Sequence, residues 1–172
     1  MTLPIETDRL LVRCFVQGDW RALQDLSVRY QATDVARLEE PWPTSDDGVQ
    51  RMTAFFSRGD EFLAVCLKDS GALIGLVAIN RRAETAGRVH NLGYVFHPDH
   101  HGRGYATEAC LATLARVFDE LGADAILTGT RAGNTGSVRL LRRLGLRDTG
   151  AGRGEYSLTR EEWLARRKQG ID

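Results

Sequence analysis

The feature that most constrains this chain is a pair of glycines that separates an apolar segment from an amphipathic one. The run Leu92–Phe96 is typical of a β-strand, whereas Tyr105–Leu121 has the apolar spacing of a helix. Gly102 and Gly104 stand one residue apart between them. Such a turn lets backbone N–H groups converge at the positive end of a helix, where they bind phosphate. The sequence therefore predicts a strand–turn–helix unit that suits a phosphate or pyrophosphate group.

Length and charge limit the classes of function. The chain has 172 residues, so we expect a single domain over residues 1–172. Its 23 basic and 23 acidic residues cancel, which gives no reason to expect nucleic acid or a membrane surface as a partner. No apolar run reaches the roughly 18–20 residues of a membrane span, and no signal-peptide pattern opens the chain. Cys14, Cys66 and Cys110 form no C-x-x-C pair and are expected to be reduced core residues of a cytoplasmic protein.

The remaining periodicity predicts an α+β protein with a mixed sheet of about 6–7 strands, mostly antiparallel, and helices on both faces. The expected strands are Ile5–Phe15, Phe62–Leu67, Leu73–Asn80, Arg88–Phe96, Ala125–Thr130 and Glu155–Leu158. The expected helices begin at Asp19, span Asp34–Glu40, Asp47–Ser57, Tyr105–Leu121 and Asn134–Leu144, and end the chain at Thr159–Lys168. Asp19 and Asn134 are the expected N-caps of their helices.

Two common phosphate-binding motifs do not fit the glycine turn. A dinucleotide fingerprint needs G-x-G-x-x-G, but Ala106 and Thr107 follow Gly104 and no third glycine arrives. A Walker loop needs a lysine before Ser or Thr, and the glycine-rich stretch from Gly129 to Ser137 has none. What remains is a short G-x-G-x-A turn, and by itself it is equally compatible with a turn that binds nothing.

Four segments in order resemble the GNAT superfamily of N-acetyltransferases, and within it the branch that contains the ribosomal-protein N-acetyltransferases. The first is the turn His101-Gly102-Arg103-Gly104-Tyr105-Ala106, similar to the family pattern [Q/R]-x-x-G-x-[G/A], with its continuation Thr107-Glu108-Ala109. The others are Glu6-Thr7-Asp8-Arg9-Leu10-x-x-Arg13, then Asn134-x-x-Ser137 with Leu140-Leu141-Arg142-Arg143-Leu144-Gly145-Leu146, and last Tyr156 to Trp163. His101 departs from the pattern, because Gln or Arg is usual there.

The resemblance implies acetyl-CoA as the acetyl donor, bound where the strand before the turn splays from the next parallel strand. The N–H groups of the turn would hold the pyrophosphate, and the backbone at the strand end would pair with the pantetheine arm. The residues implied to bind the cofactor are Val95, Phe96, His97, His101, Gly102, Arg103, Gly104, Tyr105, Ala106, Thr107, Asn134 and Ser137.

The resemblance also implies direct attack of a neutral amine on the thioester. The N–H of Phe96 would polarise the thioester carbonyl, and Ser137 would protonate the leaving thiolate, with Tyr94 as the alternative acid. Glu108 suits the first helical turn as a structural partner rather than a catalyst. A base or a water chain must take the proton of the amine. The candidates for the base are His90, His97, Asp99 and Glu155.

The acceptor is expected to be a primary amine: a protein N-terminus, an amino acid or another small amine. Glu40 and Trp42, in the loop that begins at Glu39, are the candidate substrate-binding residues, although Trp42 also suits the core. No metal is expected, because the histidines between His97 and His101 lie in an extended, proline-containing turn. A non-catalytic acyl-CoA sensor on the same fold is the alternative function. A homodimer is a family-level expectation.

Overall fold

The computed structural model describes residues 1–38, 40–131, 133–152 and 154–170. The strands are β1 (Ile5–Glu6), β2 (Leu10–Cys14), β3 (Phe62–Leu67), β4 (Leu73–Arg81), β5 (Val89–Phe96), β6 (Ala125–Gly129), β7 (Arg147–Asp148) and β8 (Glu155–Thr159). The α-helices are α1 (Trp20–Gln31), α2 (Asp46–Phe56), α3 (Tyr105–Asp119), α4 (Thr135–Arg143) and α5 (Arg160–Lys168). Short 3-10 turns are η1 (Gln17–Asp19), η2 (Val35–Leu38) and η3 (Pro98–His100).

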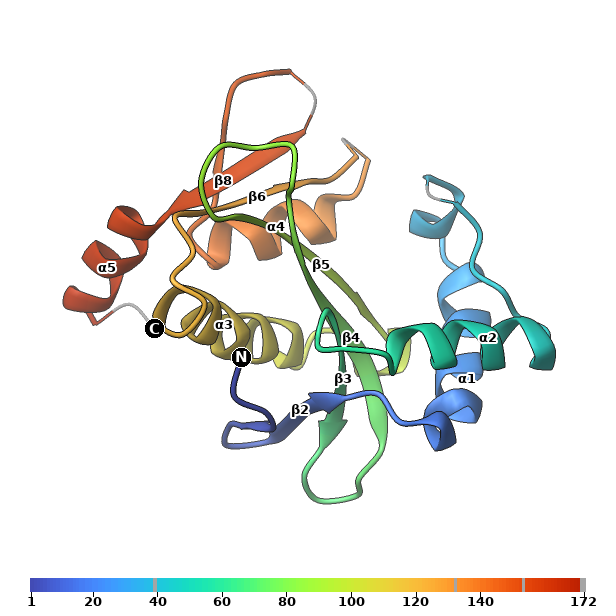
Figure 1. The fold of residues 1–172 in the computed structure, drawn as a ribbon. Helices are drawn as coiled ribbons and strands as arrows, with labels where there is room; N and C mark the ends of the chain where they lie inside the picture. The colour runs from blue at the N-terminus through green and yellow to red at the C-terminus, as the bar shows by residue number, and fades with distance from the viewer. Residues whose placement is uncertain (39, 132, 153, 171–172) are drawn as a thin grey trace.

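Within the described residues the strands form one sheet in the order β1-β2-β3-β4-β5-β6-β8-β7 (Figure 1). Among the described strands only β5 and β6 pair in parallel, and the other neighbours are antiparallel. This confirms the α+β class, but the part of the chain that the structure describes forms eight strands rather than about six or seven. The single strand expected over Ile5–Phe15 is divided by a turn that Thr7 N–H closes onto the Leu10 carbonyl. The eighth strand, β7, consists of two exposed residues that carry no apolar signal.

Helices cover both faces of the sheet, as expected. On one face α3, α4 and α5 pack over a core in which the rings of Phe118 and Trp163 stack with centroids 5.4 Å apart. On the other face α1 and α2 lie together over a second cluster that contains Leu23 and Phe56 (Figure 1). Among the described helices, none is long and apolar enough to cross a bilayer.

The parallel pair β5/β6 is very short. Its ladder consists of Val89 opposite Ala125 and His90 opposite Ile126. Beyond His90, β5 continues beside β4 as far as Phe96, while β6 continues beside β8 as far as Gly129. The two strands therefore diverge, which confirms the expected splay.

The capping predictions had mixed outcomes. The side chain of Asn134 accepts a hydrogen bond from the N–H of Ser137 (3.0 Å), so Asn134 is the N-cap of α4 as expected. Asp19 occupies the N-cap position of α1 as expected, but its side chain makes no capping hydrogen bond to the helix. Its carboxylate instead accepts two hydrogen bonds from the Arg13 guanidinium (2.8 Å each) and one from the N–H of Val16 (2.8 Å).

A polar brace ties the start of the chain to the first turn of α3. The carboxylate of Glu108 accepts hydrogen bonds from the hydroxyl of Thr7 (2.6 Å) and from Nε of Arg9 (2.7 Å). The same Arg9 donates to the Arg103 carbonyl (2.9 Å) and lies over the Tyr105 ring, 4.6 Å from its centroid. Burial alone would raise the pKa of Glu108, but the hydrogen bonds from Thr7 and Arg9 outweigh it and hold the pKa below its usual value.

We expect the substitution Glu108→Gln to lower the free energy of unfolding by about 1–3 kcal/mol at pH 7, because it weakens charge-assisted hydrogen bonds. Since the folded-state pKa is depressed, the stabilisation is complete above the unfolded-state pKa and is lost as the pH falls through the folded-state pKa. Denaturant unfolding at a series of pH values should therefore show the difference from the native chain shrinking in acid. The exposed Glu61→Gln is the matched control. A pH-independent difference would contradict the assignment to the Glu108 carboxylate.

Candidate functional site

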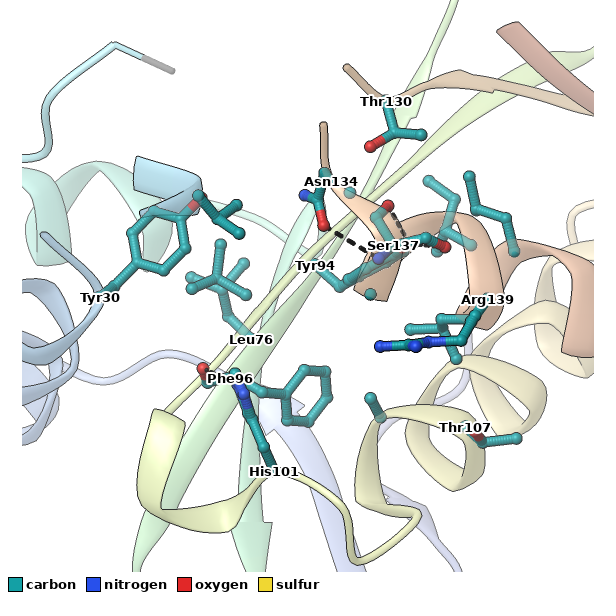
Figure 2. Close-up of a pocket in the computed structure, with 18 of the residues that line it drawn as sticks. Tyr30, Leu76, Tyr94, Phe96, His101, Thr107, Thr130, Asn134, Ser137 and Arg139 are labelled. Atoms are coloured by element: carbon teal, nitrogen blue, oxygen red, sulfur yellow. Dashed lines mark hydrogen bonds between the residues drawn. The ribbon is translucent and has the colours of Figure 1, made fainter. Parts of the chain in front are cut away.

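A cavity of about 790 Å³ opens where β5 and β6 diverge, and its volume lies within the range of small-molecule sites. One side is lined by the glycine turn and by α3 and α4, and the other by residues of α1, η2 and α2. Figure 2 shows Tyr30 and Leu76 on one side of β5, and Ser137, Arg139 and Thr107 on the other. The cavity therefore passes from one face of the sheet to the other through the gap.

The glycine turn presents backbone N–H groups at the start of α3. Gly102 and Gly104 have φ of +76° and +81°, a left-handed conformation that glycine adopts without strain. The N–H of His101 is bonded to the Pro98 carbonyl and that of Glu108 to the Gly104 carbonyl. Between them, the N–H groups from Gly102 to Thr107 have no hydrogen-bond partner within the described part of the chain. This arrangement suits an anionic ligand.

His97 and His101, which flank the turn, make hydrogen bonds within the protein. Nε2 of His101 lies 2.9 Å from the Phe96 carbonyl oxygen, so this side chain fastens the turn to the end of β5. The buried His97 ring pairs with Asp25 of α1 across 3.0 Å and does not line the cavity. Its backbone N–H is bonded to the Ile74 carbonyl (2.8 Å).

The direction of the β5 backbone corrects one expectation. Hydrogen-bonded and non-hydrogen-bonded pairs alternate along an antiparallel ladder, so the bond between His97 and Ile74 also turns the backbone of Val95 toward β4. The N–H of His97 is therefore not available to a ligand, contrary to the expectation for this residue, and the backbone of Val95 faces β4 rather than the gap. Val95 still lines the cavity. By the same alternation, the N–H of Phe96 faces the gap beside β6.

Gly75 makes room for Phe96. A Cβ atom built at position 75 would lie 2.6 Å from Cδ1 of Phe96 and 2.7 Å from the Val95 carbonyl oxygen, closer than Cβ atoms approach other atoms. The two residues face each other across β4 and β5. Because Gly75 has no side chain, Phe96 can occupy its observed position, from which its N–H faces the gap.

Two hydroxyl groups meet on the α4 side of the cavity. The Tyr94 hydroxyl lies 2.7 Å from the Ser137 hydroxyl, and Ser137 sits in the first turn of α4, where Asn134 accepts a hydrogen bond from its N–H (Figure 2). Both side chains line the cavity. The two residues expected as alternative acids therefore form one hydrogen-bonded pair.

Basic side chains from α4 lie farther along the same side. Arg139 and Arg143 line the cavity, and Arg143 donates to the hydroxyl of Thr107 (3.4 Å). They carry positive charge close to the N–H groups of the glycine turn. The side chain of Arg103, which was expected to add charge there, is exposed and is not among the described lining residues.

None of the four expected bases is among the described residues that line the cavity. His90 is buried near the far end of β5, where burial lowers its pKa. Asp99 is exposed and lies 3.9 Å from the ring of His97. Glu155 accepts a hydrogen bond from the Thr149 hydroxyl.

The expected substrate-binding residues separate in the structure. Trp42 lines the cavity and also packs on the second core cluster, so its position agrees with the core role and leaves its substrate-binding role a prediction. Glu40 is exposed and is not among the described lining residues, and Glu39 lies outside the described residues. Tyr30 lines the cavity although no sequence motif marked it, and His100, which was considered from the sequence only as part of a possible metal cluster, lines it too. In the described ranges, no group of three or more His, Cys, Asp or Glu side chains could hold a metal ion.

Comparison with known proteins agrees with this geometry. The family model described as "Acetyltransferase (GNAT) domain" matches residues 9–147. The chain belongs to this family of acetyltransferases, whose members use acetyl-CoA.

Three proteins illustrate the similarity. YnaD, an uncharacterised N-acetyltransferase of Bacillus subtilis (strain 168), is 29% identical over 150 residues, 85% of this chain and 84% of YnaD. A GCN5-related N-acetyltransferase from Brucella melitensis is 25% identical, with a TM-score of 0.81 over 99% of this chain and 84% of that one. The ribosomal-protein-S5-alanine acetyltransferase of Vibrio fischeri shares the fold at 16% identity, with a TM-score of 0.75 over 94% and 99%.

We expect Gly75→Ala to lower the free energy of unfolding by about 1–3 kcal/mol, because the new methyl group displaces Phe96 or the β5 backbone. The matched control is Gly129→Ala, where a Cβ would meet only an ordinary contact, 3.7 Å from the Gly154 carbonyl oxygen. Denaturant unfolding of both variants measures the effect. Equal destabilisation by the two substitutions would contradict the claim that Phe96 depends on the missing side chain.

Proposed function

We propose that this protein transfers the acetyl group of acetyl-CoA to a primary amine, with both substrates bound at once. The observation that carries the proposal is the open turn of N–H groups at the end of a strand that has parted from its parallel neighbour. A diphosphate at the turn and a thioester in the gap would occupy one continuous cavity.

The donor half of the cavity consists mainly of backbone. The N–H groups from Gly102 to Thr107 receive the pyrophosphate oxygens, aided by the positive end of α3. Arg139 and Arg143 supply countercharge from α4. The N–H of Phe96 and the polar groups of Asn134 and Ser137 lie along the path between the turn and the far side of β5.

The reaction places negative charge first on the thioester oxygen and then on the sulfur. A neutral amine attacks the carbonyl carbon, and the N–H of Phe96 donates a hydrogen bond to the developing oxyanion. When the tetrahedral state collapses, the C–S bond breaks and the thiolate takes a proton from the Tyr94–Ser137 hydroxyl pair, which regains a proton from water after the amine has released one there. Positioning of amine and thioester in one cavity supplies much of the remaining acceleration.

The proton of the amine leaves through water in this proposal. No Asp or Glu is among the described residues that line the cavity. An ordinary alkylamine is largely protonated at pH 7, so the rate should rise with pH as the neutral form of the acceptor increases. The cavity extends to residues on the α1 side of β5, such as Tyr30, and this extension favours an enzyme over a sensor that only binds acyl-CoA.

The direct test is thiol release from acetyl-CoA with a panel of amines, compared for the native chain, Tyr94→Phe, Ser137→Ala and the double variant. We expect each single substitution to lower kcat about 10–100-fold with little change in the KM for acetyl-CoA, because proton donation is felt mainly in the transition state. The double variant should be no slower than the slower single one, since the pair acts as a unit. Tyr156→Phe, on β8 and not among the described lining residues, is the control. Unchanged kcat in both single variants would exclude the pair as the acid.

Binding of CoA tests the donor site separately. Gly102→Ala places a side chain at φ +76°, and relief of that strain should turn the N–H groups away, lowering CoA affinity about tenfold or more. Gly71→Ala is a closely matched control, because Gly71 has φ +71° and equally open surroundings but lies in the β3–β4 turn. Titration calorimetry with CoA measures both. Equal affinities in the two variants would contradict the role of the turn.

A further inference from the structure

The half of the cavity that faces α1 and α2 differs in chemistry from the donor half. We call it the acceptor chamber, and it is lined by Tyr30, Val35, Trp42, Phe56, Phe62 and Leu76. In Figure 2, Tyr30 and Leu76 mark it on the side of β5 opposite Ser137. These side chains come from α1, η2, α2, two adjacent strands and the loop before α2.

The walls of the acceptor chamber are aromatic and already packed. The rings of Tyr30 and Trp42 lie 5.7 Å apart at 48°, and those of Phe56 and Phe62 stack with centroids 4.3 Å apart. Phe56 is buried in the core cluster beneath α1 and α2, against which Trp42 and Phe62 also pack. Because these side chains are already held in place by packing, an apolar group of a ligand can be buried against them without a cost for reorganising the walls.

The described residues of this chamber offer no negative charge to a second cation. No carboxylate is among the described lining residues. Asp25, on the same helix as Tyr30, is bonded to His97 (3.0 Å) and lies 3.8 Å from Arg29. A further ammonium group inside the chamber would lose its hydration without gaining an ion pair, which is unfavourable.

On the basis of the proposed acetyl transfer, we infer that the acceptor is a primary amine carried on a single apolar body, aliphatic or aromatic, with no second cationic group. The attacking nitrogen enters in its neutral form, so it needs no carboxylate partner. The apolar body occupies the aromatic chamber and directs the nitrogen through the gap toward Phe96 and Tyr94. Polyamines, which carry additional ammonium groups, are disfavoured.

The experiment compares phenethylamine and hexylamine with spermidine, both by turnover with acetyl-CoA and by calorimetric binding to the CoA-loaded protein. We expect kcat/KM for the two monoamines to exceed that for spermidine about tenfold or more. We also expect the Kd of each monoamine to be lower than the Kd of spermidine. Val35→Glu places a carboxylate in the chamber wall. This should reduce the preference for the monoamines over spermidine about tenfold, because the carboxylate pairs with the additional ammonium group of spermidine. Val28→Glu adds the same charge on the outer surface of α1, where Val28 is 47% exposed, and should leave the preference unchanged.

The outcomes separate this inference from the proposed function. Monoamines that bind in the expected order without being acetylated would support the chamber and refute the transfer. Acetylation with spermidine preferred would support the transfer and overturn the inference. Absence of monoamine binding to the CoA-loaded protein would also overturn it, whatever the turnover.

Discussion

The structure depends on the divergence of the neighbouring parallel strands β5 and β6. β5 and β6 pair at two positions and then separate, which leaves backbone polar groups along the second half of β5 facing a gap. Such groups in a protein interior require partners, and in the proposed function the amide groups of an extended ligand would supply them in the way that an added strand would. The glycine turn lies at the end of β5 and α4 begins across the gap, so the anion site and the hydroxyl pair are both positioned by the same divergence.

The gap is maintained by bonds on the outer sides of the two strands. β5 is paired with β4 from His90 to Phe96, and β6 is paired with β8 along its whole length. Where the parallel ladder stops, the hydroxyl of Thr128 donates to the Leu92 carbonyl (2.7 Å) and takes the place of a strand partner. At the other end of the gap, the ring of His101 is hydrogen-bonded to the Phe96 carbonyl. The part of β5 that faces the gap is thus short, has hydrogen-bonded side chains at both ends and is paired with β4 on its other side. These bonds hold its position in the fold.

Two local sequence signals predicted the structure correctly. The glycine turn before α3 and the Asn134 cap depend on a few adjacent residues, and both are present as expected. The Asp19 cap was also a local prediction, but the Asp19 carboxylate is bonded to Arg13 instead. Contacts between distant residues leave no periodic trace, so the partnership of His97 with Asp25, 72 positions away, could not be predicted. Alternation left the side of Tyr94 open, because only the register of β5 between its neighbours decides which face it occupies.

The division of the cavity explains why a family can be identified from this chain more readily than its acceptor. The donor half depends on backbone N–H groups, which most side chains leave unchanged provided that residues such as Gly102 retain their conformation. The backbone path is shared with a GCN5-related N-acetyltransferase that is only 25% identical, at a TM-score of 0.81. The acceptor chamber is built from side chains of α1, η2 and α2, such as Tyr30 and Val35, where each substitution changes the wall directly. In the proposed function, the helical layer on the far side of β5 would therefore select the amine, and the diverging strands would bind the acetyl donor.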